Sequence, residues 1–204
     1  MSAAERMNAP AGVPEEDRLR ADLYNYLGLV LSRPADTMVL AQTAGLSGDG
    51  SDLGRAVDAL AEAARDTNPK DVAREFQRLF IGLGRGELLP FASFYLTGFL
   101  NEKPLAALRT DLAALGLRRS DGVFEPEDGS ASLMETMGAL IAGRFGAPQP
   151  LMVQKTFWTK HVGPWAGHFF DDLAGRDAPF HAAVGRVGAA FMAVEREAFR
   201  MTPN

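Results

Sequence analysis

The chain has 204 residues, of which 47% are hydrophobic, and carries a formal net charge of −5. This length suits one substantial domain, and the hydrophobic content excludes a wholly disordered chain. The negative charge argues against nucleic acid as the main partner, because phosphate binding usually requires a basic surplus. Since cysteine is absent, disulfides, thiolate zinc sites and cysteine-ligated iron–sulfur clusters are excluded.

No segment has the features of a targeting or membrane-spanning sequence. Residues 1–14 are small and polar and include two prolines, so we expect a flexible tail and not an export signal. No apolar run approaches the roughly 18 residues needed to cross a bilayer. These features predict a cytoplasmic protein without direct membrane insertion, with one folded domain over residues 15–204.

Apolar periodicity predicts three helical segments in the first third of the chain. The first extends from Glu15 to Leu31, and acidic residues in its first turn complement the helix dipole. A short apolar pattern follows from Thr37 to Leu46. Asp52 is then expected to cap a helix that continues to about Arg65.

A glycine-rich stretch, residues 82–90, interrupts the next predicted helix; we call it the elbow loop. The helix begins at Asp71, and three of its residues share one apolar face: Phe76, Leu79 and Phe80. Three glycines end this helix, Pro90 prevents an early restart, and a second apolar run follows at residues 91–100. Apolar side chains on both sides indicate that the elbow loop is either buried or part of a binding site.

The remainder of the chain is predicted to be helical as well. The expected helices are Ser93–Leu100, a helix from Pro104 to about Leu115, a helix after Asp128, Leu151–His161, Pro164–Leu173 and Pro179 to about Phe199. No convincing period-two pattern bounded by hairpin turns occurs. The sequence therefore predicts an all-α protein, a single-domain helical bundle.

No motif indicates catalysis or a metal site. The segment Gly82–Glu87 lacks the Gly-Lys-Ser/Thr ending and the preceding strand of a phosphate loop. The three histidines, His161, His168 and His181, lack the glutamates three residues earlier that a di-iron bundle would supply. We therefore expect no enzyme, no catalytic residue and no bound metal.

An acidic cluster, Glu125, Glu127 and Asp128 beside Pro126, has two interpretations. Grouped carboxylates can perform acid–base chemistry. They can also stabilise the start of the next helix, for which Asp128 is well placed as the N-cap or first-turn residue. We favour the capping role.

Two stretches carry a family resemblance. The first has the pattern E-F-x-x-L-F-I-G-x-G-x-G-E-L-x-P from Glu75 to Pro90, followed by Ser93-x-Tyr95. The second, Glu125-Pro126-Glu127-Asp128, is similar to a Glu-Pro-x-Asp-His segment. Both resemble the TorD/DmsD/NarJ family of redox-enzyme maturation chaperones. The match is specific over residues 72–145 and in detail resembles members associated with formate dehydrogenases.

This resemblance implies a non-enzymatic cytoplasmic chaperone with an all-helical fold. It would bind the twin-arginine signal peptide of a molybdenum enzyme's catalytic subunit, with a formate dehydrogenase as the expected client, and hold it back from export until its cofactor is inserted. A receptor for such a peptide needs carboxylates beside an apolar groove. The implied peptide-binding residues are Phe76, Leu79, Phe80, Pro90, Phe91, Tyr95, Glu125, Pro126, Glu127 and Asp128.

The chain departs from the family pattern at Gly129, which stands where the family has histidine. We therefore carry over no role for that imidazole, and we expect no cofactor, including the GTP proposed for some relatives. The alternative function is a helical adaptor that binds the body of a client redox enzyme independently of a signal peptide. An enzyme that uses the acidic cluster on a nucleotide is a more distant alternative. Both a monomer and a dimer are compatible with the sequence.

Overall fold

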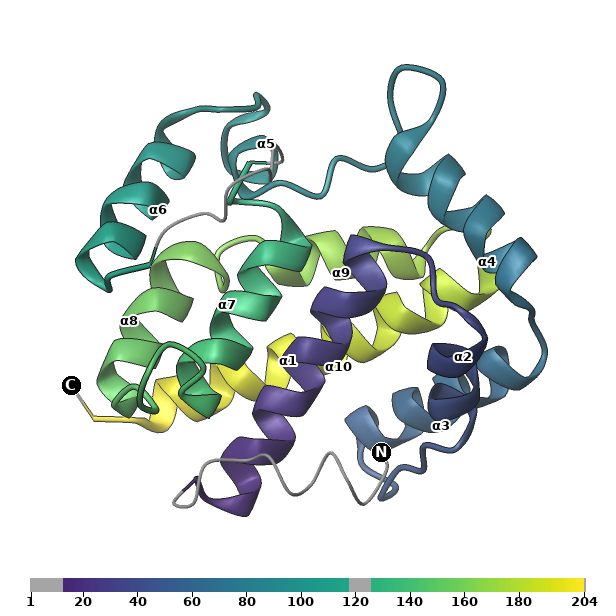
Figure 1. The fold of residues 1–204 in the computed structure, drawn as a ribbon, viewed down its shortest axis with the longest axis horizontal. Helices are drawn as coiled ribbons and strands as arrows, with labels where there is room; N and C mark the ends of the chain where they lie inside the picture. The colour runs from purple at the N-terminus through teal and green to yellow at the C-terminus, as the bar shows by residue number, and fades with distance from the viewer. Residues whose placement is uncertain (1–12, 118–125, 204) are drawn as a thin grey trace. The chain divides into compact units, whose positions relative to one another are not determined.

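The computed structural model describes residues 13–117 and 126–203. These residues form ten α-helices and one π-helix, and the same residues contain no strand, only an isolated bridge between Phe91 and Gly129 (Figure 1). The prediction of an all-α fold is confirmed. The chain divides into two compact units: unit 1 combines the chain up to Ser32 with Phe91–Pro164, and unit 2 combines Arg33–Pro90 with the chain from Trp165 onward. One domain over residues 15–204 stays a prediction, and most of the expected tail lies outside the described residues.

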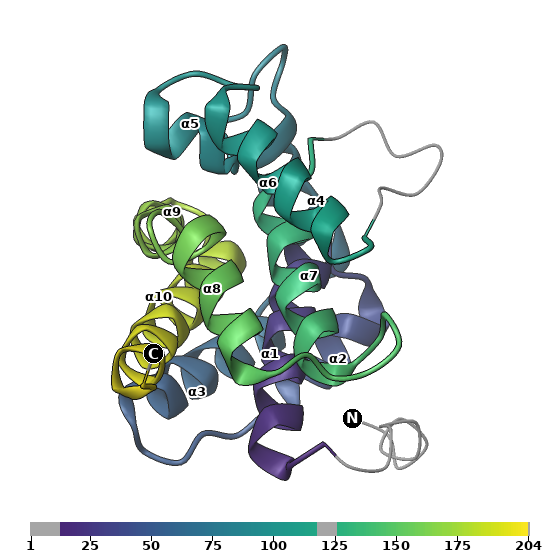
Figure 2. The same cartoon turned by 90° about the vertical axis from the view of Figure 1, so that its left-hand side faces the viewer.

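Unit 1 is built around two long helices that lie side by side. Its helices are α1 (Glu15–Ser32), α5 (Ala92–Thr97), α6 (Lys103–Ala114), α7 (Ser130–Ala142) and α8 (Leu151–His161). Helices α1 and α7 pack along their length (Figures 1 and 2). Two glycines allow this close approach, because a Cβ on Gly28 would lie 2.6 Å from Glu135 Cγ and one on Gly138 would lie 2.5 Å from Asn25 Oδ1. The buried side chains between them include Tyr24, Leu27, Leu133, Met134 and Met137.

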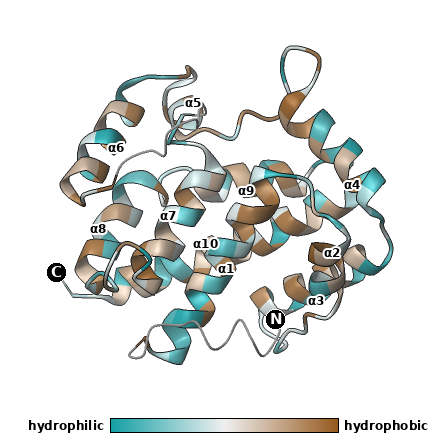
Figure 3. Cartoon of the chain, viewed as in Figure 1, coloured by the Kyte–Doolittle hydropathy of each residue, from teal (hydrophilic) through white to brown (hydrophobic). Residues whose placement is uncertain are grey.

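Unit 2 is organised by its last helix. It contains α2 (Thr37–Ala44), α3 (Asp52–Arg65), α4 (Pro69–Phe76), the π-helix η2 (Gln77–Ile81), α9 (Ala166–Ala174) and α10 (Pro179–Met201). Helix α10 packs against α3, α4 and α9. Its buried residues include Phe180, Val187 and Phe191, and α9 adds Phe169 and Phe170. Most helices are amphipathic, as the mixed colours of α3 and α4 illustrate in Figure 3.

Local side chains explain where three helices of unit 2 begin. Asp36 caps α2 and Asn68 caps α4, each by accepting backbone N–H groups of the first turn. The predicted cap of α3 is wrong by one residue, since the hydroxyl of Ser51 accepts the N–H of Gly54 at 3.0 Å and Asp52 is already helical. Among the residues that the structure describes, no helix combines the length and the hydrophobicity that a bilayer crossing requires.

The elbow loop is buried at its base and exposed at its tip. Helix α4 continues through η2 to Ile81, and Gly82 then turns the chain at a φ of +61°, a conformation that favours glycine. The N–H of Leu88 donates to the carbonyl of Leu79 at 2.9 Å, and Leu88 is buried. Leu83, at the tip, is fully exposed. The helix predicted up to Leu100 is too long, because Gly98 ends α5 in the left-handed conformation.

Candidate peptide-binding site

The segment before α7 holds the start of α5. The N–H of Ala92 donates to the backbone carbonyl of Asp128 at 2.9 Å, and the N–H of Ser93 donates to Asp128 Oδ2 at 2.8 Å. Phe91, the N-cap residue of α5, supplies no side-chain cap. Asp128 therefore caps α5. The expectation that Asp128 caps α7 is wrong, because Gly129 is the N-cap residue of α7 and the Asp128 side chain accepts the N–H of Ser93 in α5 instead.

Two polar atoms at this junction are buried and have no hydrogen-bond partner among the residues that the structure describes. Asp128 is only 1% exposed, and its Oδ1 has no hydrogen bond within the described part of the chain. The hydroxyl of Ser93, a residue with no exposed surface, also lacks one there. Burying a carboxylate oxygen without a donor is costly, so such atoms call for a structural or functional explanation. Of the two residues, Asp128 is the one that lines a pocket, so a ligand that donates a hydrogen bond there would satisfy its Oδ1.

Asp128 lines a pocket of about 500 Å³ in unit 1. This volume is within the usual range for ligand sites. Most of the lining is apolar and comes from α5, α6 and α7: Ala92, Leu96, Pro104, Ala107, Leu108 and Leu133. The charged or titratable residues in the lining are Asp111, Asp128, Lys160 and His161. The pocket therefore combines apolar walls with a buried carboxylate, one oxygen of which has no hydrogen-bond partner among the described residues.

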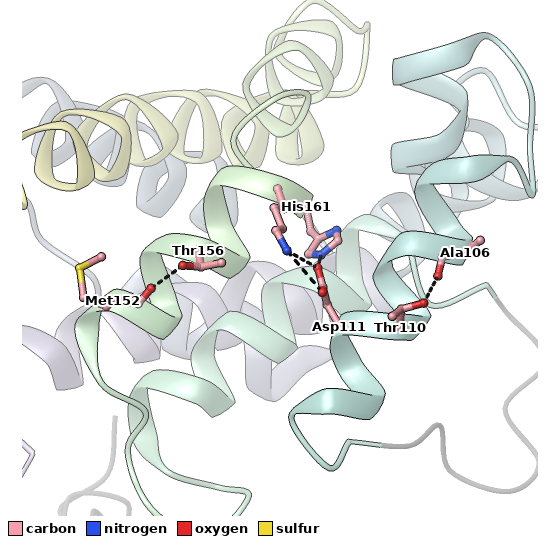
Figure 4. Close-up of polar contacts among 7 residues, drawn as sticks. Ala106, Thr110, Asp111, Met152, Thr156 and His161 are labelled. Atoms are coloured by element: carbon pink, nitrogen blue, oxygen red, sulfur yellow. Dashed lines mark hydrogen bonds and ion pairs between the residues drawn. The ribbon is translucent and has the colours of Figure 1, made fainter. Parts of the chain in front are cut away.

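A hydrogen-bonded cluster joins α6 to α8 beside this pocket. Asp111 and His161 point toward one another from the two helices (Figure 4), and Asp111 Oδ2 lies 2.7 Å from His161 Nε2 and 3.1 Å from Lys160 Nζ. The hydrogen bond from His161, followed by the bond and charge of Lys160, holds the pKa of Asp111 below its usual value. Sequence analysis missed this cluster, because no motif relates residues 50 positions apart.

Glu127 is already paired with an arginine of the chain itself. Arg109 on α6 donates Nη2–H to Glu127 Oε2 at 2.8 Å and Nε–H to the same oxygen at 3.0 Å. The Nε–H also lies 3.2 Å from Oε1, which makes the contact a fork. The hydrogen bond to Glu127, supported by the negative charges of Glu127 and Asp128, raises the pKa of Arg109.

The predicted peptide-binding residues divide between the two units. Unit 1 contains Phe91, Tyr95, Pro126, Glu127 and Asp128; unit 2 contains Phe76, Leu79, Phe80 and Pro90; and Glu125 lies outside the described residues. Within unit 1, Phe91 pairs with Gly129 through the isolated bridge, which brings it beside Asp128.

The aromatic residues of the predicted set in unit 2 pack around a histidine. The ring centroids of Phe76 and Phe80 lie 6.0 and 5.8 Å from that of His181, and Phe76 and Leu79 are buried. These residues thus contribute to the packing of η2 and α4 near α10. Their contact with a peptide stays a prediction.

The backbone at Gly129 does not require glycine. Its φ of −66° and ψ of 146° are open to any residue. A Cβ there would lie 3.5 Å from the carbonyl oxygen of Pro126 and 3.6 Å from the ring of Phe91, which are ordinary contacts. Neither the backbone conformation nor the space for a Cβ therefore requires glycine at this position.

Comparison with known proteins identifies the class. The profile of the family "nitrate reductase delta subunit" matches residues 47–171, more than half of the chain. The chain belongs to this family of TorD- and NarJ-like redox-enzyme maturation chaperones, which are not enzymes. The resemblance found in the sequence is confirmed at this level.

Three relatives that share the name "Chaperone protein TorD" support the assignment to this family. "Chaperone protein TorD" of Vibrio cholerae (El Tor Inaba N16961) is 29% identical over 157 residues, which cover 71% of each chain. The protein of the same name from Aliivibrio fischeri is 26% identical over 200 residues, covering 86% of this chain and 92% of the relative. The one from Vibrio parahaemolyticus is 31% identical over 101 residues, somewhat less than half of each chain.

Proposed function

We propose that this chain is a cytoplasmic maturation chaperone for the catalytic subunit of a molybdenum oxidoreductase. In this proposal it binds the subunit's twin-arginine signal peptide and assists cofactor insertion before export. Family membership and the TorD relatives support the chaperone role. The observation that carries peptide binding is the buried Oδ1 of Asp128, a residue of the pocket lining, which has no hydrogen-bond partner within residues 13–117 and 126–203.

The chemistry of the pocket suits this ligand. A twin-arginine signal peptide presents guanidinium groups close to an apolar segment, and the pocket presents a carboxylate among apolar side chains. A hydrogen bond to a charged group contributes roughly 1.5–3 kcal/mol, enough to make binding depend on an arginine. Contacts between apolar residues of the peptide and the pocket walls would add affinity that depends little on the sequence of the peptide.

Calorimetric titration with a leader peptide tests the proposal. A second peptide carries alanine at both arginine positions, and the expected result is at least about a tenfold loss of affinity. Asp128→Asn should cause a comparable loss with the unaltered peptide. Equal affinity for the two peptides would reject recognition of the arginine pair.

A formate dehydrogenase is the client that we propose. Its support is the detailed similarity of residues 72–145 to chaperones associated with such enzymes. Leader peptides from a formate dehydrogenase and from other molybdenum oxidoreductases of the same organism should be compared in direct competition. Weaker binding of the formate dehydrogenase leader would remove this assignment and leave the chaperone role unchanged.

An adaptor that binds the body of the client is the second candidate. It is supported by the tip of the elbow loop in unit 2, where Leu83 is fully exposed and Ile81 is half exposed. Exposed apolar side chains of this kind suit a partner surface. Undiminished capture of a client whose leader has been deleted, and its loss in Leu83→Ser, would favour the adaptor.

A further inference from the structure

We propose that apolar residues of the signal peptide bind a surface patch next to the pocket, so that the peptide runs along α5. Its arginine then lies at the start of this helix, and the apolar residues that follow lie at its end. The patch, which we call the apolar rim, consists of Leu96, Phe99 and Leu100. This inference rests on the proposed function as a signal-peptide chaperone.

The pocket extends from the buried start of α5 to its exposed end. Helix α5 contributes Ala92, its first residue, and Leu96, in its last turn, to the pocket lining. Ala92 is buried, whereas Leu96 is 41% exposed. Asp128 also lines the pocket and accepts the N–H of Ser93 at the buried end of the helix. The carboxylate therefore lies near the start of α5, and the pocket reaches the surface near its end.

The apolar rim continues the pocket lining beyond the end of α5. Leu96 and Pro104 both line the pocket, and the connection from α5 to α6 joins them (Figure 1). Phe99 and Leu100 belong to this connection, and both are exposed, Phe99 by 68%. Thr97 Oγ1 lies 3.2 Å from both the backbone nitrogen and the carbonyl oxygen of Phe99, which keeps this residue next to the end of the helix.

Three exposed apolar side chains within five residues indicate a binding surface. Single apolar residues on a surface are normal, whereas contiguous ones mark interaction sites. The rim adjoins a pocket in which Asp128 has a buried oxygen without a hydrogen-bond partner in the described part of the chain. An arginine followed by apolar residues would fill both places. A second copy of the chain that covered the rim alone would leave this oxygen without a donor.

The length of α5 sets the spacing that such a ligand needs. The six residues of this helix span about 9 Å at about 1.5 Å per residue. An extended peptide advances about 3.3–3.6 Å per residue. About three residues should therefore separate the arginine at the start of α5 from the apolar residues at its end.

A double-mutant cycle measured by calorimetry tests the inference. The ligand is the leader peptide that binds best among those of the organism's molybdenum oxidoreductases. Two further versions carry alanine at both arginines, or serine at the apolar residues two to four positions after them. The proteins are the unaltered chain, Asp128→Asn, Phe99→Ser and Phe145→Ser. Phe145→Ser is the matched control, because Phe145 is also an exposed phenylalanine of unit 1 but lies between α7 and α8.

Each protein variant should weaken binding only of peptides that carry the matching group. Phe99→Ser should lower the affinity for the unaltered leader about fivefold or more, and that for the serine version less than about twofold. Asp128→Asn should show the same pattern with the two arginine versions. Phe145→Ser should change every affinity less than about twofold. Phe99 and Phe145 are both more than half exposed, so their variants should melt like the unaltered protein.

Photo-crosslinking tests the direction and the spacing independently of affinity. A benzophenone-bearing residue is placed one, three or six positions after the arginines of the leader, or three positions before them. Mass spectrometry then identifies the labelled residues of the chain. Residues 96–100 should be labelled most strongly from the third position after the arginines. Labelling of these residues mainly from the position before the arginines would overturn the proposed direction.

The outcomes distinguish this inference from the proposed function. Arginine-dependent binding of the leader with equal affinity for Phe99→Ser and Phe145→Ser would overturn the inference and leave the function intact. Sedimentation of the unaltered protein as a dimer that Phe99→Ser dissociates, again with unchanged peptide affinity, would assign the rim to a second copy and also overturn it. Absence of binding of every leader would overturn the proposed function, and this inference with it.

Discussion

The carboxylate of Asp128 and the backbone N–H of Ser93 form a buried hydrogen bond of 2.8 Å across 35 positions of the chain. Through this bond, Asp128 in the segment before α7 fixes the start of α5, and each of the two residues has a buried polar atom that lacks a partner in the part of the chain that the structure describes. In the proposed function, stability and ligand binding therefore depend on the same side chain, that of Asp128. A substitution of Asp128 that keeps the cap of α5 but removes the charge can distinguish its effect on stability from its effect on ligand binding.

Asp128→Ala should lower the free energy of unfolding by about 1 kcal/mol, because Ser93 loses its capping acceptor. Asp128→Asn keeps an oxygen for Ser93 and should retain most of the stability, yet it lacks the charge that attracts an arginine. Chemical denaturation measures the first effect and calorimetry the second. The control is Asp36→Ala, which removes the cap of α2 in unit 2 and should lose similar stability with unchanged peptide affinity. Full peptide binding by Asp128→Asn would exclude this carboxylate from the site.

Glu75 should make unit 2 sensitive to acid. Its carboxylate accepts N–H groups of His181 and Phe180 at the start of α10, and its Oε2 lies 2.7 Å from His181 Nδ1. Burial alone would raise the pKa of Glu75, but the hydrogen bonds from His181 and from these two N–H groups lower it below its ordinary 4.5. A lowered pKa means that the stabilisation is complete above pH 4.5 and is lost as the pH falls through the folded-state pKa.

Glu75→Gln tests this dependence. The variant should lose about 1 kcal/mol of stability at pH 7, since a charge-assisted hydrogen bond becomes a neutral one. Between pH 5 and pH 3 its melting temperature should then fall less steeply than that of the unaltered protein. Glu62→Gln, at an exposed position of α3, serves as the control. If the melting temperatures of Glu75→Gln and the unaltered protein fell equally with pH, the role of the Glu75 carboxylate in acid sensitivity would be contradicted.

Gly188→Ala should destabilise the protein although alanine is the better helix former. A Cβ at this position of α10 would lie 2.1 Å from Cδ1 of the Phe170 ring, so the buried ring or the helix must shift. Overpacking of this kind costs about 1–3 kcal/mol. Gly167→Ala in α9 is the matched control, because the added Cβ meets only the end of the Arg196 side chain at 3.2 Å. Thermal unfolding of both variants gives the comparison, and equal stability would show that α9 and α10 can separate freely.

Asp111→Asn should loosen α6 against α8 with a small effect on global stability. Its partners, His161 and Lys160, lie on α8, and about a third of the Asp111 side chain is exposed. Exposed ion pairs contribute at most about 1 kcal/mol. Hydrogen exchange should therefore be faster in α6 while the melting temperature changes little. Unaltered exchange in α6 would show that apolar contacts alone hold the two helices together.

Sequence periodicity predicts the helices well because burial within a helix repeats every three to four residues. It predicts Glu15–Leu31 for α1, which ends at Ser32, and Leu151–His161 for α8 without error. Helix ends that depend on a single capping residue are predicted less accurately. Ser51, not Asp52, caps the start of α3, and Gly98 ends α5 before the predicted end at Leu100.

The chemistry of the pocket is only partly accessible to such reasoning. Asp128 stands out in the sequence as part of an acidic cluster. The sequence pattern relates it only to the helix that follows, α7, whereas its side chain accepts a hydrogen bond from Ser93 in α5. Asp111 and Arg109 carry no signal at all, because their partners lie 50 and 18 positions away and charged residues on an exposed helix face are common. Only the folded chain brings these groups together.

The division of the chain into interleaved segments has a consequence for biosynthesis. Unit 2 takes one segment that ends at Pro90 and a second that begins at Trp165, and α10, against which α3 and α4 pack, ends only at Met201. About 110 residues separate the end of the first segment from the end of α10. At a synthesis rate of about 5–20 residues per second, the ribosome needs some 5–20 s to add these residues. During this interval α3 and α4 lack the partner that covers their apolar faces. A maturation chaperone thus itself passes through an incompletely folded stage during its synthesis.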